Sequence, residues 1–179
     1  MSQLIIGLTG TMGAGKGEVA RIIADRIPGA VEVAFADRLK WIARHHYGWN
    51  GIKDERGRRL LQEIGTAGRQ YDDWMWVRHW LYAINAHVMA PCIIAPDVRY
   101  DNEAEAIIDR GGVIWSVLGN HGAASGIDNH ESERGIDNCY VDHVINNGGS
   151  ITMLADMVDS LIEATVLVRC EPELVKERT

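Results

Sequence analysis

A glycine-rich stretch at residues 10–17 contains the pair Gly15-Lys16 and carries the clearest chemical pattern of the chain. An apolar run at 4–8 precedes it, and apolar residues at helical spacing follow it up to residue 27. A strand, the pattern Gly-x-x-x-x-Gly-Lys and a helix, in this order, predict a loop whose backbone N–H groups surround a phosphate chain. The ammonium group of Lys16 would reach the outer phosphates. The stretch therefore predicts a nucleotide phosphate site, with a glycine-rich turn that binds nothing as the alternative.

The position after the lysine departs from the common form of this loop. It is normally Ser or Thr, whose hydroxyl group binds Mg²⁺, but here it is Gly17 followed by Glu18. The run Gly-Ala-Gly-Lys-Gly resembles the loop of adenylate-kinase-like nucleotide kinases, which place Thr after the last glycine. The hydroxyl group is missing at both positions, which keeps open a nucleotide-binding regulator without turnover.

Phosphoryl transfer needs several cations near one point and a carboxylate near Mg²⁺. Asp97 and Arg99 follow a short apolar run at 92–95, so we expect both to lie at the end of a buried strand. Arg58 and Arg69 are about three helical turns apart and can share one helix face. A solvated surface charge is the alternative for any single arginine, but the place of Arg99 after a buried strand favours a functional role.

The elements that must hold these residues alternate along the chain. We expect strands at 4–8, 31–35, 92–95, 113–118 and 141–145. We expect helices at 15–27, 58–70, 73–90 and 102–110, one that opens at Asp37, and a last one after Ser150. This alternation predicts an α/β fold with a mostly parallel five-stranded sheet covered on both faces. Ligands would then bind at the carboxyl ends of the strands.

The chain of 179 residues is expected to form one domain over residues 1–179. Within it, a helical insertion at about 37–90 would bind the acceptor, and a glycine-rich polar loop at about 119–138 would act as a lid. His130, Glu133 and Arg134 lie in this loop, and Arg134 would reach the donor phosphates on closure. An exposed polar loop is the alternative.

Residues at helix starts and on one helix stripe have structural explanations. Asp37 stands where an N-cap belongs, and capping alone would account for it. Asn102 with Glu105 forms a cap pair for the following helix. One stripe of helix 73–90 is typical of a core face; it consists of Trp76, Trp80, Ile84 and His87.

Composition excludes several classes of protein. The formal net charge of −7 disfavours a general nucleic-acid binder. Cys92, Cys139 and Cys170 are scattered, which disfavours a disulfide framework or a zinc site and fits a reducing compartment. No apolar run approaches membrane-spanning length, no secretion signal is evident, and we expect a cytoplasmic protein. Metal-dependent hydrolysis and acyl transfer find no support in the histidine and serine spacing.

The chain resembles the bacteriophage deoxynucleoside monophosphate kinases from about residue 7 to 150. The stretches that carry the resemblance are Phe35-Ala36-Asp37-Arg38-Leu39-Lys40, Leu60-Leu61-Gln62-Glu63-Ile64-Gly65-Thr66 with Arg69, Trp76, Asp97-Val98-Arg99 with Asn102-Glu103, His130-Glu131-Ser132-Glu133, and Ile145-Asn146-Asn147-Gly148-Gly149-Ser150. The resemblance implies a P-loop NTPase three-layer fold similar to nucleoside monophosphate kinases. It implies transfer of the γ-phosphoryl group of ATP to a dNMP, giving dNDP for DNA precursor synthesis, in the host cytoplasm if the chain is phage-encoded. It also implies a homodimer. From the charge and the hydropathy of the chain, we expect no membrane or stable nucleic-acid partner.

The family's binding residues carry over by position. The resemblance implies ATP contacts at Thr11, Met12, Gly13, Ala14, Gly15, Lys16, Gly17, Glu18, Val19, Asn147 and Gly149, the last two near the base. It implies dNMP contacts at Asp37, Leu39, Lys40, Arg58, Gln62, Gly65, Thr66, Arg69, Trp76, Asp97, Arg99, Glu103, His130 and Glu133. The catalytic set would be Lys16, Arg69, Asp97, Arg99 and Arg134. Mg²⁺ would be held by Asp97, by Glu18, or by both, through water.

The sequence leaves rivals to this hypothesis. Residues 7–10 also resemble the start of dephospho-coenzyme A kinases, so another P-loop small-molecule kinase is the nearest alternative. Adenylate kinase itself is disfavoured because its Asp-Gly-Phe-Pro-Arg signature is absent, and a GTPase because no Asn-Lys-x-Asp motif occurs. The non-catalytic regulator belongs to a different class, and phosphoryl transfer to any acceptor would exclude it.

Overall fold

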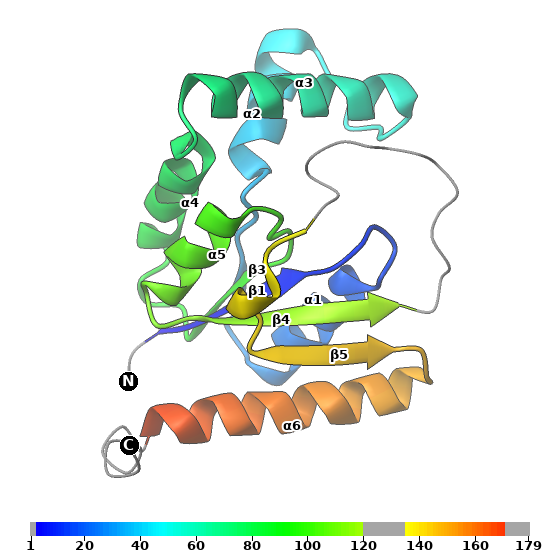
Figure 1. The fold of residues 1–179 in the computed structure, drawn as a ribbon, viewed down its shortest axis with the longest axis vertical. Coiled ribbons are helices and arrows are strands. Elements are labelled where there is room, and N and C mark those ends of the chain that lie inside the picture. Colours follow the sequence, from blue (N-terminus) through cyan, green and yellow to red (C-terminus); the bar gives the residue numbers. More distant parts are fainter. Residues whose placement is uncertain (1–2, 120–134, 171–179) are drawn as a thin grey trace.

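The computed structural model describes residues 3–119 and 135–170, with side chains up to residue 167. The strands are β1 (Leu4–Thr9), β2 (Val31–Glu32), β3 (Cys92–Ala95), β4 (Val113–Gly119) and β5 (His143–Asn147). The helices are α1 (Lys16–Arg26), α2 (Asp37–Tyr47), α3 (Glu55–Tyr71), α4 (Met75–Asn85), α5 (Asp101–Ile108) and α6 (Ile151–Cys170), with a 3₁₀ turn, η2, at Asn138–Tyr140. The alternation of strands and helices confirms the expected α/β class (Figure 1).

The five strands form one sheet in the order β2-β3-β1-β4-β5, and every pair is parallel. The central strand β1 pairs with β3 from Leu4 opposite Cys92 to Gly7 opposite Ala95. The segments that follow these two strands therefore leave the sheet side by side at one edge. This edge holds the glycine-rich loop after β1 and Asp97 after β3.

Helices cover both faces of the sheet and give it three layers. One core packs α1 and α6 on the sheet, with Ile6, Leu8 and Trp115 fully buried among them. The other packs α4 and α5 on the opposite face, around Trp80 and Ile107. Figure 1 shows α6 along one side of the sheet and α4 and α5 on the other. Burial of β1 on both faces explains why its sequence is apolar from residue 4 to residue 8.

Helices α2, α3 and α4 form an arm that places α3 far from the sheet (Figure 1). Two buried indole groups hold the arm. Trp76 Nε1 donates to the carbonyl of Gly65 at 3.0 Å, which ties α4 to α3. Trp80 Nε1 donates to the carbonyl of Val33 at 2.9 Å, which ties α4 to the segment after β2. Gly68 also packs directly against the Trp76 ring, where a side chain would collide.

The structure shifts several of the expected boundaries. Strand β2 ends at Glu32 rather than at residue 35. Val33 N still donates to the carbonyl of Ile94 in β3, but the N–H groups of Ala34 and Phe35 donate to carboxylates instead of the sheet. Helix α3 starts at Glu55, with Asp54 as its N-cap accepting from Gly57 N at 2.7 Å. Helix α4 ends at Asn85, and strand β5 covers 143–147 rather than 141–145. The predicted core stripe therefore ends at Ile84, and His87 is exposed.

Two expected caps are wrong, and one is confirmed. Asp37 is the first helical residue of α2 rather than its N-cap, and its Oδ2 accepts from Ala34 N at 2.9 Å. Helix α5 is capped by Glu103, which accepts from Tyr100 N, whereas Asn102 donates to the carbonyl of Asp73. Ser150 caps α6, as expected, and accepts from Met153 N at 3.2 Å.

Candidate active site

The glycine-rich loop leaves β1 and returns into α1 through three residues with positive φ. These are Gly10, Gly13 and Gly15, with φ of 131°, 81° and 98°. Gly15 is the N-cap of α1, so the N-terminal N–H groups of that helix open onto the loop. The side chain of Lys16 folds over the loop, and its Nζ donates to the carbonyls of Gly10 at 2.6 Å and Thr11 at 2.9 Å. This backbone has the form that binds phosphate groups.

The end of β5 supports this loop from outside. Asn147 Nδ2 donates to the carbonyl of Ala14 at 3.0 Å. The amide of Asn147 also fills the space beside Gly15, where a Cβ atom would collide with it. Asn147 was predicted to lie near the ATP base; its hydrogen bond to the Ala14 carbonyl gives it a role in holding the loop.

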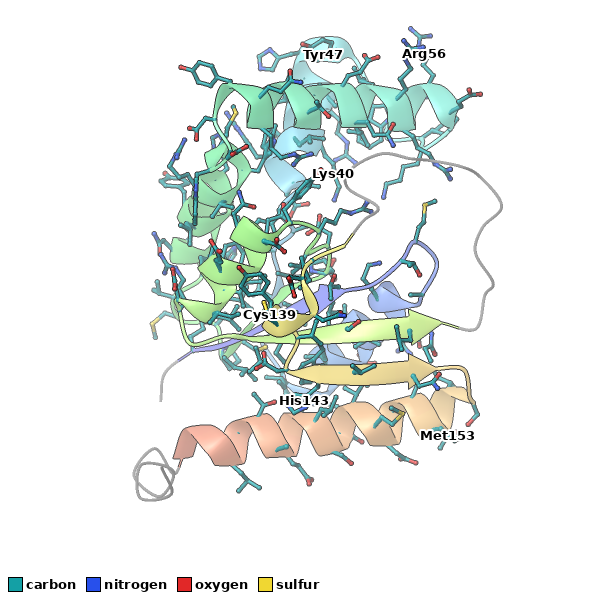
Figure 2. The ribbon with its side chains drawn as sticks, viewed as in Figure 1. Lys40, Tyr47, Arg56, Cys139, His143 and Met153 are labelled. Atoms are coloured by element: carbon teal, nitrogen blue, oxygen red, sulfur yellow. The ribbon has the colours of Figure 1, made fainter. Side chains whose placement is uncertain are left out.

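A cavity of about 440 Å³ extends from the loop to the helical arm. It is lined by Met12, Lys16, Gly17, Glu32, Ala34, Phe35, Ala36, Leu39, Lys40, Lys53, Arg58, Leu61, Gln62, Arg69, Trp76, Pro96, Asp97, Arg99, Tyr100 and Glu103. Figure 2 shows Lys40 between α3 and the sheet, at the level of this cavity. The cavity therefore joins the predicted phosphate loop and most of the predicted acceptor residues.

The charge of the lining is opposite in sign to that of the whole chain. The cationic side chains are Lys16, Lys40, Lys53, Arg58, Arg69 and Arg99, and the acidic ones are Glu32, Asp97 and Glu103. The chain as a whole carries a formal net charge of −7. Cations concentrated in one cavity of an acidic protein favour an anionic ligand there.

Asp97 connects the end of β3 to the start of the helical arm. Its Oδ1 accepts from Phe35 N at 2.9 Å, and its Oδ2 accepts from Ala36 N at 3.1 Å. Burial raises the pKa of Asp97, whereas nearby Lys40 and the two backbone donors oppose this shift. Asp97 therefore fixes the backbone from which Asp37 and Lys40 project, in addition to facing the cavity.

Glu103 is the most buried carboxyl group of the cavity, with 5% of its surface exposed. Burial, together with the charge of Asp97, raises the pKa of Glu103 to about 8. Its Oε2 accepts from Arg99 N at 2.8 Å and from Tyr100 N at 3.3 Å. Glu103 thus fixes the backbone at the start of α5, where Arg99 enters the cavity.

The structure brings only part of the predicted site together. From the predicted sets, the cavity lining contains Met12, Lys16, Gly17, Leu39, Lys40, Arg58, Gln62, Arg69, Trp76, Asp97, Arg99 and Glu103. Gly65 and Thr66 lie on α3 outside this lining, and Asp37 pairs with Lys40 at 3.2 Å beside it. Val19 is fully buried in the core, so its side chain does not face the loop. His130, Glu133 and Arg134 lie outside the described residues.

Residues that sequence reasoning missed also line the cavity. Lys53, to which the sequence analysis gave no role, lines the cavity from a turn in which Trp49 Nε1 donates to the carbonyl of the preceding residue, Ile52, at 2.9 Å. Tyr100 and Glu32 were assigned no role. The only sequence signal for Tyr100 was its position between Arg99 and Glu103.

The donors around the loop fit Mg²⁺ only in part. Glu18, one predicted metal residue, pairs with Arg21 at 2.6 Å on the exposed face of α1 and does not line the cavity. Among the described residues, no three His, Cys, Asp or Glu side chains are grouped as metal ligands. Asp97 and Glu32 face the cavity, and Mg²⁺ in phosphate sites needs only one or two carboxylates besides phosphate and water. The described residues therefore fit a metal held through Asp97 better than one held by Glu18.

Comparison with known proteins identifies one family. The model of the family described as deoxynucleotide monophosphate kinase matches residues 49–158. A protein of Acanthamoeba polyphaga mimivirus with the provisional name deoxynucleotide monophosphate kinase is 32% identical over 144 residues. That match covers 63% of this chain and 72% of the viral protein.

Solved structures with a similar fold include two that align over nearly the whole chain. TT1252 from Thermus thermophilus has a TM-score of 0.52 and 20% identity, over 92% of this chain and 98% of its own. Shikimate kinase from Acinetobacter baumannii, solved with shikimate, has a TM-score of 0.50 and 12% identity, over 97% of this chain and 96% of its own. These similarities confirm the three-layer P-loop kinase fold.

No helix in the part of the chain that the structure describes could span a membrane.

Proposed function

The chain belongs to the deoxynucleotide monophosphate kinase family, and from this premise we propose that it transfers the γ-phosphoryl group of ATP to a dNMP. The products would be ADP and a dNDP. The observation that carries the proposal is the cavity that joins Lys16 and Gly17 at the loop to Arg58 and Arg69 on the arm and to Arg99 before α5. A donor phosphate chain at the loop and an acceptor phosphate at the arginines would meet inside it.

The reaction needs little proton transfer from the protein. An oxygen of the acceptor phosphate attacks the γ-phosphorus of ATP, and the bond from that phosphorus to the β-phosphate oxygen breaks. The acceptor oxygen is already anionic at neutral pH, so no general base is required. The main barrier is repulsion between two anionic groups, and convergent cations lower it.

The cavity distributes this work between its two ends. Lys16 and the N-terminus of α1 would hold the β- and γ-phosphates of ATP. Arg69 and Arg99 would hold the acceptor phosphate, since a guanidinium group matches phosphate oxygens in bidentate geometry. Asp97 would orient a Mg²⁺ ion through water, and the ion would neutralise charge on the ATP oxygens.

An assay of ADP release tests the proposal. Purified protein is given ATP and Mg²⁺ with each of four dNMPs, four NMPs and dephospho-coenzyme A. We expect turnover with at least one dNMP at a rate well above that of ATP alone. The variant Lys16→Ala should lose this turnover and keep the wild-type circular dichroism spectrum, because the ammonium group of Lys16 donates to the carbonyls of Gly10 and Thr11 in the loop, outside the core of the sheet.

Each of the other outcomes would contradict part of the proposal and indicate a different function or a different role for the loop. Turnover with dephospho-coenzyme A alone would contradict the proposal and indicate another P-loop small-molecule kinase. ATP binding without turnover on any acceptor would indicate a regulator. Gly17 and Glu18 would then be the positions at which to introduce the missing Ser or Thr hydroxyl group. Wild-type rates in Lys16→Ala would contradict the assignment of the loop.

A further inference from the structure

The guanidinium group of Arg69 lies between an aromatic ring and a bare helix backbone. Its Cζ is 3.9 Å from the centroid of the Tyr100 ring. On α3, one turn before Arg69, Gly65 has no side chain. A Cβ atom at this position would lie 3.1 Å from Arg69 Nη2, so the guanidinium group lies close to the bare helix backbone. Both Arg69 and Tyr100 line the cavity. This arrangement restricts a long, flexible side chain to one plane.

Local structure fixes each partner of this contact. Arg69 is in the last turn of α3, whose position is set by the hydrogen bond from Trp76 to the Gly65 carbonyl. Tyr100 is the N-cap of α5, and its backbone N–H donates to Glu103. The ring and the guanidinium group therefore come from two elements that are held independently of each other.

From this contact we propose that Tyr100 is a positioning residue that clamps Arg69 in the plane in which its N–H donors face the acceptor phosphate. The proposal rests on the proposed function, because it takes the phosphate of a dNMP as the anion that Arg69 binds. It adds a residue that sequence reasoning did not assign. Tyr100 acts through Arg69 and needs no contact with the substrate.

Two physical effects make such a clamp useful. An unrestrained arginine loses side-chain entropy when it binds an anion, whereas a stacked one has already lost it on folding. Glu103 also lies close enough to interact with Arg69 when its carboxyl group is ionised. Stacking on Tyr100 keeps the guanidinium group facing the cavity instead of turning toward this carboxyl group.

The rival explanation for the ring is direct stacking on the base of the substrate. Trp76 is a poor candidate for base stacking, because only 3% of its surface is exposed. If Tyr100 stacked on the base, its loss would weaken dNMP binding whether or not Arg69 was present. If it acts through Arg69, its loss would matter only while Arg69 is there. A double-mutant cycle separates the two explanations.

The first experiment measures dissociation constants for dTMP, dCMP, dAMP and dGMP by calorimetry. Tyr100→Leu should weaken the binding of each accepted dNMP by about fivefold or more, in line with the loss of a cation–π contact. Tyr100→Phe, which keeps the ring, should stay within about twofold of wild type by the same argument. Tyr71→Leu, at a tyrosine that is 89% exposed on the end of α3, is the matched control.

The cycle adds Tyr100→Leu to Arg69→Ala. We expect the second change to have almost no further effect on dNMP binding in that background, and ATP affinity to stay unchanged in Tyr100→Leu alone. An equal loss in both backgrounds would overturn the proposal in favour of base stacking. A loss of ATP affinity would overturn it as well, because the clamp would then serve the loop.

A second experiment does not depend on any substrate. In ¹H–¹⁵N spectra, the Nε–Hε signal of Arg69, identified by its disappearance in Arg69→Lys, should be shifted by the ring current of Tyr100. Tyr100→Leu should remove the shift and Tyr100→Phe should keep it. An unchanged signal in Tyr100→Leu overturns the clamp. Failure of the wild-type protein to bind any dNMP would instead overturn the proposed function, and the clamp would then be decided by this spectrum.

Discussion

Asp97 and Arg99 leave the same strand end, but the structure gives them different tasks. Both carboxylate oxygens of Asp97 accept backbone N–H groups from the segment that begins the helical arm. The backbone of Arg99 is fixed by Glu103 at 2.8 Å, and its side chain lines the cavity. Loss of Asp97 would therefore disturb the arm itself, whereas loss of the Arg99 side chain should act mainly on the ligand.

Replacement of Arg99 by alanine should selectively weaken the use of the acceptor. We expect KM for dNMP to rise by about tenfold to a hundredfold, the usual effect of losing a hydrogen bond between charged groups. The dissociation constant of ATP should stay within about twofold of wild type, since Lys16 and the N-terminus of α1, rather than Arg99, would hold the ATP phosphates. Steady-state kinetics and ATP titration measure the two effects. Arg110→Ala, at an exposed arginine after α5, is the control; a loss confined to ATP binding would place Arg99 on the donor side.

Glu103 should make the protein less stable as the pH rises. Burial raises its pKa to about 8 in the folded protein, above the 4.5 of an unperturbed glutamate. The folded state therefore holds the proton more tightly than the unfolded chain, and this contribution to stability is complete below pH 4.5 and lost as the pH rises to about 8.

Comparison with Glu103→Gln isolates this effect. Glutamine keeps a side-chain oxygen for the N–H groups of Arg99 and Tyr100 but does not titrate. Thermal unfolding at several pH values should show that Tm of the wild type, relative to the variant, falls between pH 5 and pH 8. A constant difference in Tm over this range would mean that Glu103 does not hold its proton in the folded state.

At the scale of elements, strand β5 and the glycine-rich loop act together. The amide of Asn147 holds the carbonyl of Ala14 and occupies the space beside Gly15. β5 is an edge strand that pairs only with β4 among the described strands, and α6 packs beside it. The shape of the loop therefore depends on an element that lies far from it in the sequence.

Asn147→Ala should loosen the loop and weaken ATP binding. We expect the dissociation constant of ATP to rise by about threefold to tenfold, because a buried carbonyl loses its partner and the loop gains freedom. The KM for dNMP should change little. Asn146→Ala is the matched control, since Asn146 is exposed and its Oδ1 accepts from Gly148 N in the turn after β5. Equal effects of the two changes on ATP binding would contradict the bracing role.

The order of elements could be predicted from the sequence, but several of their ends could not. Apolar runs and glycines act locally, so β1, α1 and β3 lie where their residues predict them. The early end of β2 depends on Asp97, more than 60 residues away, which takes the N–H groups of Phe35 and Ala36. Asp37 likewise satisfies the N–H of Ala34 instead of capping α2. Such side-chain acceptors from distant segments leave no periodic signal.

The same distinction holds for the site of the whole molecule. Lys16, Asp97 and Arg99 follow buried strands, and adjacent parallel strands bring such residues to one edge, so their meeting was predictable. The contact of Tyr100 with Arg69 depends on how α3 packs above the sheet, and the place of Lys53 depends on the turn in which Trp49 bonds to Ile52. The packing angle of a helix is set by side-chain contacts along its whole length, which a short motif does not encode.

The cavity also has a consequence for the whole molecule, because it joins the sheet with α1 on one side to the helical arm on the other. A ligand that joins adenosine through five phosphates to the deoxynucleoside of the best acceptor should occupy both ends at once. Its second end binds at a high effective concentration once the first is bound. Ligands that bind only the folded state raise Tm according to their affinity. We therefore expect this compound to raise Tm by more than ATP and the dNMP together at the same concentration.

Thermal unfolding of three proteins tests this expectation. The additional rise in Tm should be lost both in Lys16→Ala, which lacks the donor-end cation, and in Arg99→Ala, which lacks the acceptor-end cation. It should persist in Arg26→Ala, because Arg26 pairs with Asp159 at 2.8 Å on the far side of α1. A rise in Tm equal to that of ATP alone would show that donor and acceptor do not share the cavity. Transfer between phosphates requires them to meet within it, so this result would contradict the proposed reaction as well as the geometry.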